Sequence, residues 1–222
     1  HGEVMMFGAY FAFIFAYMLP FELPFIAIVL VTMAFAALMG MLIERIAYKR
    51  LRTAPRISAL ITAIGMSLFL QNLALLIFGA TPYVMKPLIS TEPVVLFGFS
   101  IARLTLLTIG LSILFMIILT LFVRKTKPGK AMRAVSQDKE AAILMGINVN
   151  TTISLTFALG SALGALGGIF YAMAYVNVES TLGVLPGLKA FIAAVFGGIG
   201  NIQGAMLGGY LIGIIETFVK AY

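Results

Sequence analysis

Long apolar runs separated by short polar segments dominate the pattern of this chain. An α-helix needs about 20 apolar residues to cross the roughly 30 Å of hydrocarbon in a bilayer. Five runs reach or approach that length, and they cover residues 2–18, 25–44, 57–79, 104–123 and 151–176. None of them alternates apolar and polar positions with the period of two found in barrel strands, so the pattern predicts five membrane-spanning helices.

A sixth apolar stretch, residues 190–215, contains no charged side chain but is interrupted by four glycines within residues 197–204. Each Gly costs ~1 kcal/mol relative to Ala inside a helix, so the pattern predicts a break there and a helix from Ala205 to about Phe218. Broken backbone is tolerated in a bilayer where it is buried in protein or lines a polar cavity. The expected fold is therefore all-α: a polytopic membrane bundle with a broken or re-entrant C-terminal helix, forming one domain over residues 1–222.

Composition excludes several classes of protein. Hydrophobic residues make up 62% of the chain and charged residues 10%, with a mean hydropathy of +1.10. A soluble domain carries about 25% charged residues to cover its surface, so a soluble enzyme, a disordered chain and most nucleic-acid-binding proteins are excluded. The absence of cysteine excludes a disulfide scaffold.

The basic residues are concentrated in two segments. Residues 45–56 contain five Lys and Arg residues and residues 124–139 contain six, so these segments hold 11 of the 15 in the chain. An even number of predicted spans separates them, and cytoplasmic loops are enriched in Lys and Arg, so both are expected on the cytoplasmic side. A patch for lipid headgroups predicts the same positions. Residues 80–103 are then outside, and their apolar run is expected to lie on the membrane surface or to form a hairpin.

The basic segment 124–150 predicts two short helices. Pro128 suits a first helical turn, which predicts a helix from Pro128 to Ala134. Ser136 is the expected N-cap of the second helix, with Asp138 and Glu140 in its first turn. Gly146 is a natural stop. The small residues at positions 141 and 142 would let a partner approach this second helix closely.

Here the sequence resembles a known family. Glu140-Ala141-Ala142-x-x-x-Gly146 resembles the EAA loop of ABC importer permeases, which docks into the ATPase subunit. The segments LRTAPRISALITAIGMSLFLQN, GKAMRAVSQDKEAAILMGIN and GLKAFIAAVFGGIGNIQGAMLGGYLIGIIE, together with the initial His1-Gly2-Glu3, resemble the branched-chain amino acid permeases of the LivH type. The resemblance covers nearly the whole chain and implies a fragment that lacks spans at both ends.

The resemblance implies a set of partners and a location. It implies a second permease subunit, cytoplasmic ATP-binding subunits and an extracytoplasmic substrate-binding protein, in the inner membrane of a prokaryotic cell. No cofactor is expected in this chain, because Gly129-Lys130 lacks both the upstream Gly and the following Ser/Thr of a P-loop, so ATP is bound by a partner. The residues expected to contact the ATPase are Gly129, Arg133, Asp138, Glu140, Ala141, Ala142 and Gly146.

Polar and glycine residues within the apolar stretches are the candidates for a translocation pathway, since ionisable and polar groups in a bilayer mark functional sites. They are His1, Glu3, Gln71, Asn72, Gly197, Gly198, Gly200 and Asn201. At least one of Gln71 and Asn72 is expected simply to pair with a neighbouring helix, and the glycines can equally serve close helix packing. Packing is the better interpretation of the small-x-x-x-small pairs Gly160/Gly164 and Gly204/Gly208.

The function that these features favour is translocation of branched-chain or related amino acids by an ATP-driven importer. The alternative is an ion-coupled secondary transporter, or a channel-like protein for small polar solutes. It is less favoured because the interiors of the predicted spans carry almost no charged side chains that could form a coupling relay. With one His, no Cys and no clustered carboxylates, no catalytic or metal-binding residues are expected. The substrate stays open, since related permeases carry urea or amides.

Overall fold

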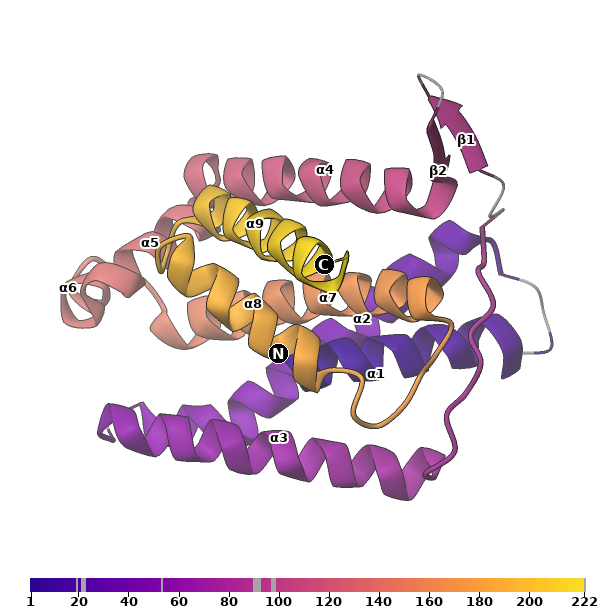
Figure 1. The fold of residues 1–222 in the computed structure, drawn as a ribbon. Coiled ribbons are helices and arrows are strands. Elements are labelled where there is room, and N and C mark those ends of the chain that lie inside the picture. Colours follow the sequence, from indigo (N-terminus) through magenta and orange to yellow (C-terminus); the bar gives the residue numbers. More distant parts are fainter. Residues whose placement is uncertain (19, 21–22, 53, 90–92, 97–98, 222) are drawn as a thin grey trace.

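The structure is a computed structural model that describes residues 1–222 except 19, 21–22, 53, 90–92, 97–98 and 222. Most helices are long rods that lie roughly parallel or antiparallel, with two short helices at one end and a β-hairpin at the other (Figure 1). We call these the α5–α6 end and the hairpin end. The elements are α1 (Gly2–Phe13), η1 (Ile14–Met18), α2 (Phe25–Ile43), η2 (Glu44–Tyr48), η3 (Lys49–Leu51), α3 (Arg56–Phe78), β1 (Pro93–Leu96), β2 (Phe99–Ala102), α4 (Arg103–Lys125), α5 (Lys127–Gln137), α6 (Lys139–Leu144), α7 (Val149–Tyr175), α8 (Val184–Phe196) and α9 (Ile202–Ala221).

Five helices in the described part of the chain are long and apolar enough to cross a membrane, which confirms the predicted fold class. They are Phe25–Leu51, Ile57–Phe78, Arg103–Lys125, Val149–Tyr175 and Ile202–Ala221. The predicted span at residues 2–18 forms a shorter apolar helix, Gly2–Met18. The chain after residue 44 was expected to be a loop, but it stays helical through η2 and η3, because no Gly or Pro interrupts residues 44–51.

Small residues bring the central helices α1, α2 and α7 together. A Cβ atom on Gly8 would lie 2.5 Å from the Ala165 Cα, and one on Gly40 would lie 1.9 Å from the Ser161 Oγ. Such contacts leave no room for a larger side chain, and close backbone approach is how membrane helices associate without a hydrophobic driving force. The helices α3, α4 and α9 lie outside this central group and expose many apolar side chains.

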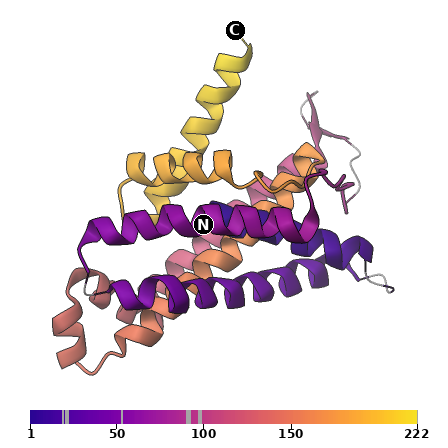
Figure 2. The same ribbon diagram turned by 90° about the horizontal axis from the view of Figure 1, so that it is seen from below.

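The C-terminal region contains the predicted break. The helix α8 ends at Phe196 and α9 begins at Ile202, which confirms an interruption within the predicted segment. The helix α8 begins at Val184, six residues before the apolar stretch that starts at residue 190, because Pro186 is tolerated in its first turn. Figure 2 shows α9 leaving the other helices toward its C-terminal end.

The start of α8 lies deep in the bundle. A Cβ on Gly183 would lie 2.0 Å from the carbonyl oxygen of Gly2, and one on Gly2 would lie 3.1 Å from the Cα of Gly187. Residue 1 in turn lies beside Gly160, near the middle of α7. The chain therefore turns back into the bundle after α7, and α8 is a half-length helix that begins at mid-depth and ends toward the α5–α6 end (Figure 1).

The segment between α3 and α4 forms one of the two structures expected for it. The strands β1 and β2 pair antiparallel, with Pro93 opposite Ala102. Nearby, Tyr83 forms an isolated antiparallel bridge with Val178, and each backbone N–H donates to the other carbonyl at 2.9 Å. This bridge connects the hairpin end to the link between α7 and α8.

Candidate translocation site and coupling helices

The two short helices α5 and α6 are each capped by a side chain. The Thr126 hydroxyl accepts a hydrogen bond from the Gly129 N–H at 3.1 Å, at the start of α5. The Asp138 carboxylate accepts from the N–H groups of Glu140 and Ala141 at 2.9 and 3.1 Å, at the start of α6. The prediction of Ser136 as this cap was wrong. Because α5 continues to Gln137, the extended backbone that a cap requires first occurs at Asp138.

The helix α6 ends as the sequence predicts. Gly146 has φ +79°, a left-handed conformation that favours glycine. Its N–H donates to the Ile143 carbonyl at 2.9 Å, and the N–H of Ile147 donates to the Ala142 carbonyl at 3.0 Å. These bonds satisfy carbonyls that the end of a helix would otherwise leave unpaired.

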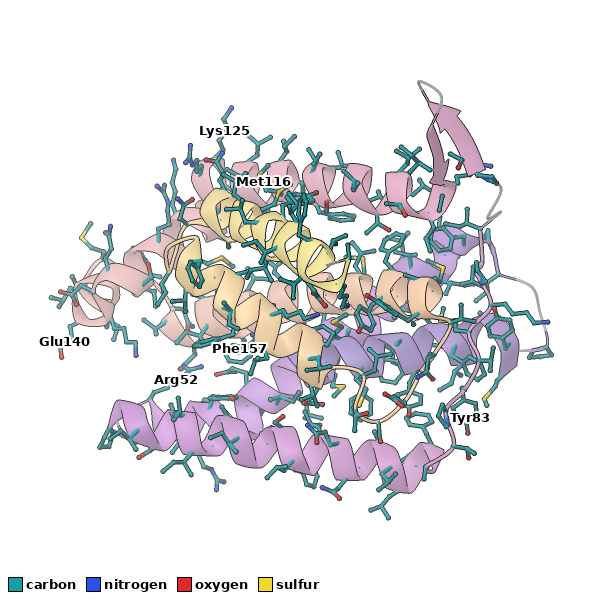
Figure 3. The ribbon with its side chains drawn as sticks, viewed as in Figure 1. Arg52, Tyr83, Met116, Lys125, Glu140 and Phe157 are labelled. Carbon is teal, nitrogen blue, oxygen red and sulfur yellow. The ribbon has the colours of Figure 1, made fainter. Side chains whose placement is uncertain are left out.

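The residues predicted to contact an ATPase fall into two groups. Gly129 and Ala142 are buried, and a Cβ on Gly129 would lie 2.3 Å from the Phe122 carbonyl oxygen at the end of α4. Arg133 is exposed and reaches the Arg124 carbonyl at 3.4 Å. Asp138, Glu140, Ala141 and Gly146 are also exposed, and Glu140 points outward from the tip of the α5–α6 end (Figure 3).

Three apolar side chains between Glu140 and Gly146 are exposed at this tip. Ile143, Leu144 and Met145 are 60%, 87% and 81% exposed. They belong to α6 and its C-terminal turn, outside the helices that are long enough to span a membrane. The signal in the sequence was an apolar run directly after Glu140-Ala141-Ala142, inside a segment otherwise rich in Lys and Arg. Contiguous exposed apolar surface of this kind is typical of sites that contact another protein or a membrane.

A polar cluster lies between α1 and α3. Glu3 is 7% exposed, and its Oε1 accepts hydrogen bonds from the Ser67 hydroxyl at 2.7 Å and the Gln71 amide at 2.8 Å. Its Oε2 is buried and has no hydrogen-bond partner among the described residues, and no ion pair of Glu3 is found in the described part of the chain. Ser67 lies near the middle of α3, so this carboxyl group sits near mid-depth of the bundle.

Two other predicted pathway residues lie outside this polar cluster. Asn72 is exposed and donates to the Leu68 carbonyl of its own helix at 2.8 Å. The His1 ring faces α7, with 5.8 Å between its centroid and that of Phe157. The sequence suggested Glu3 and Gln71 separately, and the structure brings them together with Ser67, which no local pattern had marked.

The glycine-rich break forms a tight turn at the opposite end of α8. At 1.5 Å per residue, 13-residue α8 places this turn about 20 Å from the start of the helix. Gly198 and Gly200 both have φ +91°. A Cβ on Gly204 would lie 1.9 Å from the Gly197 carbonyl oxygen, and the Asn201 side chain caps α9 by accepting from the Gly204 N–H at 3.2 Å. These residues therefore have roles in the turn and in helix packing, and their place in a translocation pathway stays a prediction.

An apolar cavity lies beside α7. It has a volume of about 550 Å³ and lies between α4, α7 and α9. Its polar groups are hydroxyls such as those of Thr108, Ser112 and Tyr171, and none of the described residues that line it is charged. This cavity offers no charged partner for the ammonium or carboxylate of an amino acid, so the Glu3 cluster is the better candidate for an ionic contact at mid-depth.

Comparisons with known proteins agree with this architecture. A family model described as "Branched-chain amino acid transport system / permease component" matches residues 1–222. The chain is 40% identical over 232 residues to the high-affinity branched-chain amino acid transport system permease protein BraD of Pseudomonas aeruginosa, covering 98% of this chain and 74% of BraD. It is 38% identical over 236 residues to the permease protein LivH of Escherichia coli K12, covering 100% of this chain and 75% of LivH.

A more distant relative is the autoinducer 2 import system permease protein LsrC of an Enterobacter species. It is 30% identical over 121 residues, which cover 51% of this chain and 35% of LsrC. No solved structure matches the chain. The full-length match to the family model, on a bundle of membrane-spanning helices, shows that the chain belongs to the family of permease components of branched-chain amino acid transport systems.

Proposed function

We propose that this chain forms the transmembrane pathway of an ATP-driven importer for branched-chain amino acids. The observation that carries the proposal is the exposed apolar tip of α6. As a transport permease, the chain forms the pathway through the membrane. The helix α6, which is fixed at both ends, lies outside the membrane-spanning helices and binds the energy-supplying subunit.

The ATPase contact is centred on Ile143, Leu144 and Met145, with Glu140 and Ala141 beside them. Their exposed apolar surface would be unfavourable in water, and burying an apolar side chain of this size stabilises a complex by roughly 1.5–3 kcal/mol. The fixed ends of α6, at Asp138 and Gly146, hold this surface in one orientation. Preorganisation of this kind lowers the entropic cost of binding.

The substrate contact is the Glu3 carboxyl group. A branched-chain amino acid carries an ammonium group, and the buried Oε2 of Glu3 offers it an acceptor near mid-depth. Ser67 and Gln71 hold the other oxygen, which fixes the direction of the carboxyl group.

The remaining partners follow from the same proposal. A second permease subunit completes the pathway, a substrate-binding protein delivers the amino acid at the hairpin end, and ATP is bound by the ATPase subunits rather than by this chain. The names of BraD and LivH favour a branched-chain amino acid as the substrate. LsrC, a more distant relative, is named for a different solute, so the test below compares several solutes.

The test is reconstitution of the chain with its ATPase subunits, second permease and binding protein in proteoliposomes. We expect leucine to accumulate only when ATP is supplied on the α5–α6 side. Accumulation driven by a proton or sodium gradient without ATP would favour the alternative of a secondary transporter. ATP-driven accumulation of urea or an amide, but not of leucine, isoleucine or valine, would contradict the substrate assignment alone.

A further inference from the structure

A buried ion pair lies at the α5–α6 end, separate from both the Glu3 cluster and the exposed tip of α6. Glu44 in η2 is 1% exposed, and its Oε1 pairs with the guanidinium group of Arg52. Its Oε2 accepts a hydrogen bond from the Ser154 hydroxyl at 2.6 Å. The other terminal nitrogen of Arg52 donates to the Asn150 side-chain oxygen. These four side chains connect the end of the α2 helix, the turn after η3 and the first turns of α7.

Stability alone does not account for this arrangement. Desolvation of two charges commonly offsets their attraction, so a buried ion pair is a weak source of stability and its better-attested role is to fix one geometry. The planar guanidinium group of Arg52 suits that role, because it binds two acceptors at once in a fixed fork. Here the two acceptors belong to different elements, Glu44 to η2 and Asn150 to α7.

The same arginine faces the short helix α6 across a cavity. This cavity has a volume of about 410 Å³ and is lined by Arg52, by Lys139 and Ile143 of α6, and by residues 147–150. A close-packed interior resists displacement, whereas open space on one side of a helix permits it. A shift of α6 therefore displaces residues 147–150, which join α6 to α7 and include Asn150, the partner of Arg52. The packed helices of the bundle resist such a displacement.

The two elements joined by Arg52 are parts of the central pair of helices. Gly40 of α2 lies against Ser161 of α7, which is fully buried, so these helices are in backbone contact. The pair in turn packs on α1, which carries Glu3. A change of angle between the ends of α2 and α7 therefore also moves the helices around the Glu3 cluster.

We propose that the contact of Arg52 with Glu44 and Asn150 is the link through which the position of α6 controls α2 and α7. Arg52 and Asn150 act here as positioning residues, because they convert a movement of α6 into a change in the bundle. This inference rests on the proposed function, in which α6 binds the ATPase.

Two substitutions remove the contact between Arg52 and Asn150 but leave a positive charge beside Glu44. Arg52→Lys keeps a cation for Glu44, but a compact ammonium group cannot hold both acceptors in the fork geometry. Asn150→Ala removes the same contact from the α7 side. Arg50→Lys is the matched control, because Arg50 lies two residues before Arg52 and its side chain is exposed.

The measurement is the amount of amino acid imported per ATP hydrolysed by the reconstituted complex, together with the yield of assembled complex. We expect Arg52→Lys and Asn150→Ala to assemble and to hydrolyse ATP, while import per ATP falls about tenfold, a usual size for coupling between sites. The double variant should be no worse than either single variant, because both remove one shared contact. Arg50→Lys should match the unmodified chain.

Unchanged import per ATP in both variants would overturn the proposal. Additive losses of import per ATP in the double variant would also overturn it. Loss of assembly in both variants would overturn it too, because the contact would then be needed for folding, although each variant keeps a positive charge beside Glu44. A complex of unmodified subunits that hydrolyses ATP but imports no branched-chain amino acid contradicts the proposed function instead. In that case the stimulation of ATP hydrolysis by the binding protein still reports on the link, and both variants should lose it.

Discussion

At the scale of single residues, Glu3 is a charged side chain in a buried environment. A carboxyl group that is 7% exposed, with one oxygen unpartnered among the described residues, is costly to bury. A binding site for a cation offsets that cost whenever the cation is present. In the proposed function, the ammonium group of the substrate plays this part beside the Glu3 carboxyl group.

The first prediction is that Glu3→Gln impairs import without impairing assembly. Glutamine has nearly the same shape and retains hydrogen bonding to Ser67 and Gln71, but it loses the charge. A hydrogen bond to a charged group contributes about 1.5–3 kcal/mol, so the import rate should fall roughly tenfold to hundredfold. The matched control is Asn72→Ala, which removes an exposed amide that bonds only to its own helix among the described residues.

The measurement is ATP-driven leucine import at saturating binding protein, with complex yield followed in parallel. Wild-type import by Glu3→Gln would remove Glu3 from the substrate contact. An equal loss of import in Asn72→Ala would show that polarity in this part of the bundle matters in general, rather than the carboxyl group itself.

Gly146 carries a second prediction at this scale. Its φ of +79° is a conformation that a β-branched residue adopts only with strain of about 1–2 kcal/mol, and no atom lies within 4 Å of an added Cβ. Gly146→Val should therefore misdirect the end of α6 and weaken ATPase binding through the backbone alone. Gly146→Asn should bind nearly normally, because Asn tolerates the left-handed region. Co-purification of the ATPase with each variant is the measurement, and equal recovery with both would contradict the role of this turn.

At the scale of elements, the α8–α9 hairpin shows two separate uses of glycine. Gly198 and Gly200 supply positive φ in open surroundings, whereas Gly197 and Gly204 supply contact between the two helices. The sequence contains four glycines in eight residues, but it does not tell which of them serve the turn and which serve the contact between the helices. The division depends on which residues of α8 and α9 face each other, and that is set by packing.

The third prediction separates packing from helix propensity within α9. Gly204→Ala places a Cβ 1.9 Å from the Gly197 carbonyl oxygen and should lower the yield and thermal stability of the folded chain. Gly213→Ala is the matched control, since no atom lies within 4 Å of the added Cβ and Ala is favoured over Gly in a helix by about 1 kcal/mol. Gel filtration and a thermal melt in detergent are the measurements. Equal behaviour of both variants would show that the α8–α9 contact contributes nothing to stability.

Elements also differ in how far the sequence predicted them. Four of the five predicted spans and the stop at Gly146 depend on local properties, apolar length and a tolerated φ, and they were predicted correctly, whereas residues 2–18 form a helix shorter than a full span. The sequence favoured Ser136 over Asp138 as the cap of α6, because the position of the cap depends on where α5 ends. The continuation of the helix past Glu44 was not predicted either. The contact between Glu44 and Ser154 joins residues 110 positions apart, so no local pattern could have indicated it.

The charged side chains of the α8–α9 hairpin show the same limit. Glu216 pairs with Lys220 one turn away, which helical spacing predicts, but it also pairs with Lys189 of α8 at 2.7 Å. The second partner comes from the reversal of the chain between α8 and α9. Side chains that meet through such a reversal are visible only in the folded molecule.

At the scale of the whole molecule, its two ends differ in chemistry. The α5–α6 end carries both basic segments and the exposed tip of α6, and the hairpin end carries β1 and β2 (Figure 1). Because Lys and Arg are enriched on the cytoplasmic side of membrane proteins, the α5–α6 end is expected in the cytoplasm, where ATP is available to a bound ATPase. The proposed function depends on this orientation.

The last prediction tests that orientation directly. The chain contains no cysteine, so single cysteines can be introduced and labelled one at a time. Gln137→Cys, at the end of α5, should react with a membrane-impermeant thiol reagent only after the cells are opened. Ser100→Cys, in the exposed strand β2, should react in spheroplasts from outside. Both sites are exposed and polar, so each serves as the other's control for reactivity. Labelling of Gln137→Cys in closed spheroplasts would place α6 on the side without ATP, and no arrangement of the remaining contacts could then connect it to an ATPase.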